Sequence, residues 1–481
     1  MTLFAFLDRE HTIAPPGYSR WLVPPAALAI HLSIGQVYAF SVFNLPLSRL
    51  IGITESAPGD WKLSTIGWVF SVAIVFLGVS AALFGSWLER VGPRKAMFAS
   101  ALCFSGGFLV AALGVWLHQF WLLVLGYGVL GGIGLGLGYI SPVSTLIKWF
   151  PDRPGMATGM AIMGFGGGAM IASPLAVALM DRFRTPESQG VAQTFLTMGI
   201  LYFAYMMFGV FMVRVPPPGW APAGYTPSPR QRALVTTHDV RVNEAMRTPQ
   251  FWLLWVMLCV NVTAGIGVLG QASPMIQEMF PGVITVAAAA GFVGLLSLSN
   301  MSGRFIWSSL SDVIGRKMTY AIFFALGTVL YSSIPTTGRL GSVVLFVIGY
   351  VIILSMYGGG FATIPAYLRD LFGTAEVGAI HGRLLTAWST AGVLGPVLVN
   401  YIREYQIGRG VPKAEAYSLT MYLMAGLLVI GFVCNLAVRP VHPRHHVPPP
   451  DRGVTPVDTE AARAVASTPE PGTAARGPGH G

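Results

Sequence analysis

The chain has 481 residues, of which 53% are hydrophobic and only 10% are charged, whereas soluble domains carry about 25% charged residues. This composition excludes an ordinary water-soluble protein and indicates that lipid is the main solvent. The net charge of +10 is typical of basic cytoplasmic loops in a membrane protein, so nucleic acid is not expected among its partners.

The first 20 residues are expected to form a retained cytoplasmic tail. Positions 8 to 10 are charged, and no cleavable small-residue site follows a short apolar core, so a secretory signal is not predicted. The three cysteines lie inside later apolar segments without CxxC spacing. They predict neither a disulfide framework nor a metal site.

Long uncharged stretches predict membrane helices in chain order. No Asp, Glu, Lys or Arg occurs between Phe98 and Ile147 or between Gly155 and Met180, and about 20 apolar residues suffice for one helical span. The stretches are too long and continuous for barrel strands. Charges and Pro/Gly clusters divide the chain into twelve expected helices, near residues 22–48, 64–87, 96–117, 120–147, 155–180, 193–213, 250–275, 285–310, 318–335, 340–368, 377–402 and 416–438.

The predicted helices form two sets of six, in residues 21–214 and 250–439. A polar segment rich in Pro, Arg and Thr, residues 215–249, is expected to be a cytoplasmic linker between them. Residues 440–481 lack apolar periodicity and are expected to be a disordered cytoplasmic tail. Most basic residues fall on the side of the N-terminus, which predicts a multi-pass protein of the cytoplasmic (inner) membrane with both termini inside.

An internal repeat relates the two sets. The segment from Glu89 to Lys95 recurs from Asp312 to Lys317, 223 residues later. Two other pairs share an offset of 222 residues, Phe150 with Phe372 and Pro174 with Pro396. Related halves with the substrate held between them near the bilayer midplane are typical of secondary transporters that rock between two states.

The repeated loop, an acidic residue followed by Gly and a basic pair, resembles the loop signature of the major facilitator superfamily. Three further segments, residues 148–155, 247–252 and 300–307, are similar to the oxalate/formate antiporter family, and the match runs from about Trp21 to Arg439. The resemblance implies an all-α polytopic fold with 12 transmembrane helices in two six-helix pseudo-repeats. It also implies transport of small carboxylates by alternating access, as an antiporter or a proton symporter.

The resemblance further implies a substrate site. The family's span-eight arginine, which pairs with the substrate carboxylate, matches Arg304, and the aromatic positions that cage the anion match Tyr38, Tyr139, Phe165, Tyr357 and Phe361. Oxalate-exchanging members also place a lysine in span eleven, where this chain has Trp388. Losing one of two cations favours a monocarboxylate such as formate, lactate or pyruvate over a dianion.

Arg304 also stands out from the residues alone. Inserting an arginine at bilayer depth costs about 2.5 to 3.5 kcal/mol, so such residues usually line a polar cavity, where the planar guanidinium suits a carboxylate. Asn300, one turn earlier on the same face, favours the cavity. The alternative is a structural arginine that extends toward Asp312. Trp388 lies near mid-span and is either a cavity wall or a helix-packing residue.

Two intramembrane histidines, His31 and His381, are candidates for proton coupling because imidazole changes charge near neutrality, although hydrogen-bonded scaffolding is the alternative. In the two related loops, the pairs Glu89/Arg94 and Asp312/Arg316 are expected to brace the inward-side gate. These loop residues are conformational candidates and not substrate ligands.

Other function classes lack their motifs in the sequence. There is no HExxH, GxSxG or Walker motif and no intramembrane carboxylate pair, so neither an enzyme nor a nucleotide or other cofactor is expected. The expected partners are a small carboxylate and the lipid bilayer, with a monomeric functional unit. Two alternatives stay open: an exporter of a neutral or apolar solute whose pocket uses Trp388 and the aromatic residues, and a non-transporting sensor on the same fold.

Overall fold

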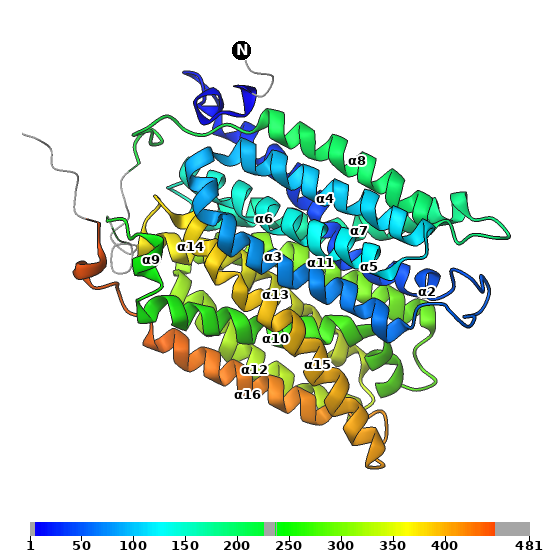
Figure 1. The fold of residues 1–481 in the computed structure, drawn as a ribbon. Coiled ribbons are helices and arrows are strands. Elements are labelled where there is room, and N and C mark those ends of the chain that lie inside the picture. The colour runs from blue at the N-terminus through cyan, green and yellow to red at the C-terminus, as the bar shows by residue number, and fades with distance from the viewer. Residues whose placement is uncertain (1–4, 226–235, 237, 448–481) are drawn as a thin grey trace, which may run out of the picture.

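The computed structural model describes residues 5–225, 236 and 238–447, and these residues are almost entirely helical (Figure 1). The first half contains α1 (Val23–Ile34), η4 (Gly35–Phe43), α2 (Asn44–Leu47), α3 (Leu63–Val91), α4 (Pro93–Trp116), α5 (Phe120–Leu123), η5 (Val124–Leu130), α6 (Gly131–Trp149), α7 (Pro154–Phe183) and α8 (Val191–Met212). The rest contains α9 (Val242–Ala245), α10 (Pro249–Met279), α11 (Val286–Ile314), α12 (Arg316–Arg339), α13 (Val343–Phe372), α14 (Val377–Leu384), α15 (Thr386–Gly408) and α16 (Ser418–Ala437). Four short 3-10 helices are η1 (Ala5–Leu7), η2 (Arg9–Thr12), η3 (Arg20–Leu22) and η6 (Pro443–His445).

The described helices confirm the predicted fold class. Eleven continuous helical stretches are long and apolar enough to cross a membrane. The helix α11 has 29 residues and is also long enough to cross a membrane, with Asn300 and Arg304 in its interior. With α11 the spanning helices number twelve in the described part of the chain, as the sequence predicted.

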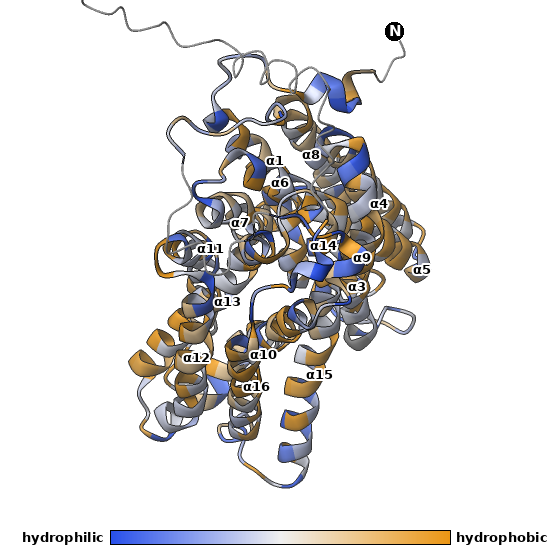
Figure 2. Cartoon of the chain, turned by 90° about the vertical axis from the view of Figure 1, so that its left-hand side faces the viewer, coloured by the Kyte–Doolittle hydropathy of each residue, from blue (hydrophilic) through white to orange (hydrophobic). Residues whose placement is uncertain are grey.

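The outer surface of the bundle is suited to lipid. Figure 2 shows hydrophobic residues on the outward sides of the helices, and large apolar side chains such as Leu83, Val329 and Val344 are more than 60% exposed. In water this exposure would be unfavourable, whereas in a bilayer those side chains contact acyl chains. Polar side chains with a role in function are therefore expected inside the bundle or at its two ends.

A glycine with positive φ marks each copy of the repeated loop. Gly92 separates α3 from α4 and Gly315 separates α11 from α12, and both have φ of 88°. Side chains other than that of glycine are strained in this region of φ. The repeat seen in the sequence is therefore also a repeat of backbone geometry, in which two long helices meet at a sharp corner.

Besides the fourth span, in which η5 is π-helical, two spans change their helical geometry near the bundle centre. The first span passes from α1 into the 3-10 helix η4 at Gly35, where an added Cβ would lie 2.4 Å from the carbonyl oxygen of Phe165 on α7. The eleventh span is interrupted at Leu385, between α14 and α15. These irregularities place Tyr38 and Trp388, which directly follow them, beside the interface between the halves.

Both described chain ends lie at the same end of the bundle, on the left in Figure 1, which we call the terminal end. The linker also contacts the last described residues there, since Val447 N donates to the Asp239 carbonyl oxygen at 2.8 Å and His445 pairs with Glu244 at 3.2 Å. Of the expected tail, residues 440–447 thus pack on the linker. The remainder of that prediction, residues 448–481, lies outside the described residues.

Candidate functional site

The guanidinium of Arg304 is completely buried at the interface between the halves. Its Nε donates to Asn300 Oδ1 at 3.1 Å and its Nη1 to the Ile162 carbonyl oxygen at 3.3 Å. Its Cζ lies 5.6 Å from the ring centroid of Phe165 and 5.3 Å from that of Phe361. Among the described residues Nη2 has no hydrogen-bond partner and no carboxylate pairs with the side chain. A buried cation is normally paired with an anion, and Arg304 has none among the described residues.

Six aromatic rings from both halves surround this arginine. Trp388 lies 4.4 Å from Phe361, 5.3 Å from Phe165 and 5.2 Å from Tyr139 between ring centroids. The hydroxyls of Tyr38 and Tyr357 approach to 3.4 Å and connect η4 with α13 across the interface. The structure therefore brings together every residue that the sequence assigned to the substrate site: Arg304, Asn300, Tyr38, Tyr139, Phe165, Tyr357, Phe361 and Trp388. The indole Nε1 of Trp388 is a second buried donor without a partner in the described chain.

The structure does not place Arg304 against Asp312, which was the alternative interpretation of that arginine. Asp312 instead accepts from the backbone N–H groups of Gly155 and Met156, each at 2.8 Å, and pairs with Arg316 at 2.6 Å. All hydrogen bonds of the Arg304 side chain stay within the site. The guanidinium therefore has no acidic side chain at its own level of the bundle in the described residues.

A cavity of about 370 Å³ leads from the opposite end of the bundle to this site. Asn300, which accepts a hydrogen bond from Arg304, is part of the cavity wall. The cavity therefore reaches a residue that contacts the guanidinium directly. No Asp, Glu, Lys or Arg is among its described lining residues. Its polar lining consists of amides and hydroxyls from both halves, namely Tyr38, Ser41, Asn44, Gln271, Ser297, Asn300 and Asn400.

The two histidines lie on the other side of the aromatic cluster, toward the terminal end. The ring centroids of His31 and His381 are 5.4 Å and 5.8 Å from that of Tyr139, and both side chains are buried. The Nδ1 atom of His31 hydrogen-bonds to the Ala27 carbonyl oxygen at 3.2 Å. The structure thus groups both histidines around one tyrosine of the site.

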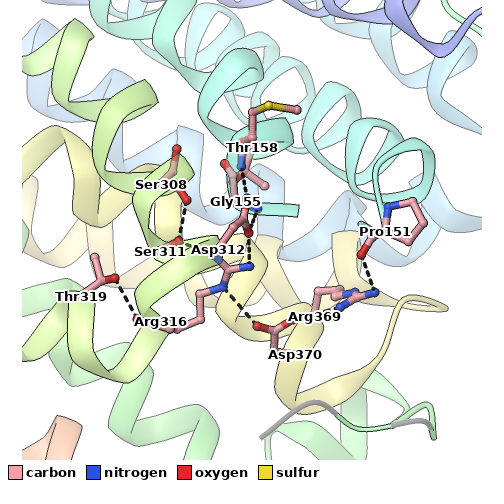
Figure 3. A network of polar contacts seen from close by, with 12 residues as sticks. Pro151, Gly155, Thr158, Ser308, Ser311, Asp312, Arg316, Thr319, Arg369 and Asp370 are labelled. Carbon is pink, nitrogen blue, oxygen red and sulfur yellow. Dashed lines mark hydrogen bonds and ion pairs between the residues drawn. The ribbon is translucent and has the colours of Figure 1, made fainter. Parts of the chain in front are cut away.

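Figure 3 shows polar contacts at the terminal end in which side chains of the second half bind the backbone of the first half. The carboxylate of Asp312, at the end of α11, accepts from the first backbone N–H groups of α7, which belongs to the first half. Arg316 holds this carboxylate and also contacts Asp370 Oδ2 at 3.1 Å. A negative charge at a helix N-terminus is stabilising, so this contact favours the closed arrangement.

A second contact crosses the interface in the reverse direction. Glu89, at the end of α3 in the first half, accepts from Gly378 N at the start of α14 at 3.0 Å and pairs with Lys148 at 2.8 Å. We call the contacts of Asp312 and Glu89 the terminal-end gate. Because they join the halves at the terminal end while the cavity leads to the opposite end, the structure represents a state closed at the terminal end.

The predicted pair of Glu89 with Arg94 is wrong, whereas the pair of Asp312 with Arg316 is present. Arg94 donates to the carbonyl oxygens of Phe6, His11 and Val213, at 2.7, 3.3 and 3.0 Å. The N-terminal segment and the residue after α8 offer these acceptors, while the Glu89 carboxylate contacts the start of α14. Sequence reasoning missed Lys148 and Asp370 as gate residues, although both lie in or beside segments that repeat between the halves.

Comparison with known proteins gives a consistent picture. The model of the Major Facilitator Superfamily matches residues 17–396 and 284–471. The oxalate:formate antiporter of Oxalobacter formigenes is 26% identical over 381 residues, which cover 78% of this chain and 83% of that protein. Apicoplast pyruvate carrier 1 of Toxoplasma gondii is 24% identical over 443 residues, covering 81% and 78%. The solved structure of the transporter FucP in the outward conformation has a TM-score of 0.61 at 13% identity, covering 86% of this chain and 98% of that one.

Proposed function

Because the chain belongs to the major facilitator superfamily, whose model matches residues 17–396, we propose that it transports small monocarboxylates by alternating access. The observation that carries the proposal is the state of Arg304. Its guanidinium is fully buried, has a free donor at Nη2 and has no acidic partner among the described residues, yet the wall of the cavity reaches it through Asn300. A carboxylate supplies both the missing charge and the missing acceptor.

The choice of a monoanion rests on the count of cations at the site. Arg304 is the single cationic side chain that contacts the aromatic cluster in the described structure, and Trp388 occupies the position where the oxalate/formate antiporter family resemblance implied a lysine. One carboxylate neutralises one guanidinium, whereas a dianion would leave a negative charge in a lining without further cations. Formate, lactate, pyruvate and similar acids fit this requirement. The names of the antiporter and of the pyruvate carrier among the relatives support the same substrate class.

Charge neutralisation also explains how substrate drives the change of state. When the opposite end closes over an empty site, the unpaired guanidinium loses the water of the neighbouring cavity, which costs several kcal/mol, so the empty chain changes state more slowly than the loaded one. A bound carboxylate removes that cost and adds charge-assisted hydrogen bonds from Nη2 and from Trp388 Nε1. The loaded chain can then close the cavity and release the terminal-end gate. In this proposal the terminal end faces the cytoplasm across the inner membrane, and one chain is the functional unit.

The test is counterflow of labelled formate, lactate, pyruvate and oxalate in proteoliposomes. We expect counterflow of one or more monocarboxylates by the native chain and its loss in Arg304→Ala. The matched control is Arg339→Ala, because Arg339 is an exposed arginine at the end of α12, outside the site. Normal counterflow by folded Arg304→Ala would contradict the proposal and would favour a neutral or apolar solute.

A further inference from the structure

Two buried histidines from opposite halves meet at the same tyrosine. His31 on α1 belongs to the first half and His381 on α14 to the second, and they are 0% and 1% exposed. Each ring packs against Tyr139, whose own ring contacts Trp388 and Phe165 of the proposed substrate site. The two histidines therefore lie at the interface between the halves, between the proposed substrate site and the terminal end.

His31 offers a proton acceptor that the described structure leaves unused, and His381 has an unpartnered ring nitrogen beside the same tyrosine. The bond from His31 to the Ala27 carbonyl oxygen requires a hydrogen on Nδ1, so the neutral ring carries its lone pair on Nε2. Neither Nε2 of His31 nor Nε2 of His381 has a hydrogen-bond partner in the described chain. Because most buried side-chain nitrogens have a hydrogen-bond partner, the two unpartnered Nε2 atoms favour a proton-binding role over scaffolding.

His31 and Arg304 pack against opposite faces of α7, at positions only two residues apart. A Cβ added to Gly164 would lie 3.1 Å from His31 Cβ, and one added to Gly166 would lie 3.1 Å from Arg304 Nε. Across a single helix in a dry interior, a protonated imidazole at His31 and an unpaired guanidinium at Arg304 repel each other. A carboxylate on Arg304 cancels the repulsion, so binding of the anion and binding of a proton favour each other.

From this geometry we propose that His31 and His381 form one shared proton site, and that each monocarboxylate crosses the membrane together with one proton. The proposal rests on the proposed function and adds the coupled ion. The proton comes from water in the outward-facing cavity and leaves to the cytoplasm with the acid. His381 lies one turn after Gly378, whose N–H group Glu89 holds, so the proton site and the terminal-end gate share the short helix α14.

The other ionisable groups on the elements around α1 and α14 are already engaged. Tyr139 on α6 and Arg304 on α11 belong to the site itself. Toward the terminal end, Glu89 on α3 pairs with Lys148 on α6, and Asp370 on α13 pairs with Arg316 and Arg369. At the start of α14, Glu376 accepts from Val242 N at 2.7 Å, and Arg383 on α14 donates to Ser86 Oγ at 3.3 Å. Each of these described carboxylates therefore already has a partner.

The experiment compares counterflow with accumulation driven by a pH gradient, using labelled pyruvate in proteoliposomes of the full chain. The variants are His31→Asn, His381→Asn and the double variant, because the asparagine amide at position 31 keeps a donor for the Ala27 carbonyl oxygen but does not titrate near neutrality. His118→Asn is the matched control, since His118 lies in a loop, stacks on Trp61 and has φ of 52°, which asparagine tolerates. Vesicles with Arg304→Ala give the background of undissociated acid that crosses the lipid.

With one proton per carboxylate, one pH unit supports about tenfold accumulation. We expect that accumulation in the native chain and in His118→Asn, and a ratio near one in the double variant, which should keep counterflow. As a second measurement, pyruvate added to native vesicles without a gradient should be followed by proton uptake that a pH-sensitive dye reports. Gradient-driven accumulation by the double variant at the native level would overturn the proton site.

The two proposals fail in distinguishable ways. Counterflow that depends on Arg304 but shows no response to the gradient and no proton uptake would overturn the proton site and leave the carboxylate transporter standing as an exchanger. Absence of Arg304-dependent counterflow from the folded native chain would overturn the proposed function itself. If the double variant does not fold, the two single variants and the dye measurement on the native chain still decide the question.

Discussion

Replacing Asp312 with asparagine should open the terminal-end gate. The carboxylate accepts two backbone hydrogen bonds from α7, both at 2.8 Å, and one ion pair from Arg316 at 2.6 Å. Asparagine keeps one acceptor oxygen and loses the charge, while Arg316 retains Asp370 as a partner. The variant therefore loses at least one charge-assisted hydrogen bond that joins the halves.

The size of the effect follows from that loss. A hydrogen bond to a charged group contributes about 1.5 to 3 kcal/mol, and we expect the contacts of Asp312 with α7 to be lost when the terminal end opens. The ratio of open to closed molecules should therefore rise by about 10- to 150-fold. A change of this size is easily measured as altered access of a thiol reagent from the terminal end.

The assay uses a single cysteine behind the gate. Thr158 on α7 is buried and donates to the Ala362 carbonyl oxygen of the other half at 2.6 Å, so Thr158→Cys in a chain without its native cysteines reports separation of the halves. The control is Asp152→Asn, because Asp152 pairs with Arg20 at 2.6 Å within the first half and does not bridge the halves. Equal maleimide labelling rates for the Asp312 and Asp152 variants would refute the assignment of Asp312 to the gate.

Three further predictions follow from single side chains. Arg304→Lys keeps the charge but loses the planar fork and its contacts with Phe165 and Phe361, so monocarboxylate counterflow should fall about tenfold or more, as measured by initial rates. Trp388→Lys adds a second cation to the site and should raise the ratio of oxalate to formate counterflow. Burial raises the pKa of Asp60, but hydrogen bonds from Ile51, Gly52 and Ala57 outweigh burial and hold that pKa below its usual value. Asp60→Asn should therefore lower Tm near neutral pH, with the difference vanishing as acid protonates the native carboxyl.

The sequence predicted the spans and the fold class because lipid imposes a simple rule on composition. Runs of apolar residues long enough to cross a bilayer can be read without tertiary information, and the repeat from Glu89 to Asp312 fixed the relation of the halves. The change to a 3-10 helix at Gly35 and the interruption at Leu385 could not be predicted in this way. Both depend on how closely another helix approaches, and neither position carries a proline.

For the candidate site, the sequence predicted which residues take part but not which contacts they make. The family resemblance selected Arg304 and the aromatic positions, and the structure brings these residues together. It could not reveal that Nη2 of Arg304 stays unpartnered or that the hydroxyls of Tyr38 and Tyr357 meet across the interface. The expected Glu89–Arg94 pair failed for a related reason. Charges close in sequence suggested a local pair, whereas Glu89 bonds to Gly378, 289 residues away.

The interface between α7 and α11 links Arg304, the proposed substrate ligand, to the terminal-end gate. Arg304 and Asp312 are eight residues apart on α11, about 12 Å along its axis, so both move with one rigid helix. On the facing side, a Cβ at Gly155 would lie 2.1 Å from the Ser308 carbonyl oxygen and one at Gly159 would lie 2.1 Å from Ser308 Oγ. The glycines thus permit a contact too close for side chains. Any shift of α11 that follows neutralisation of Arg304 must therefore also shift Asp312 against the start of α7, which is the contact that has to break before the terminal end can open.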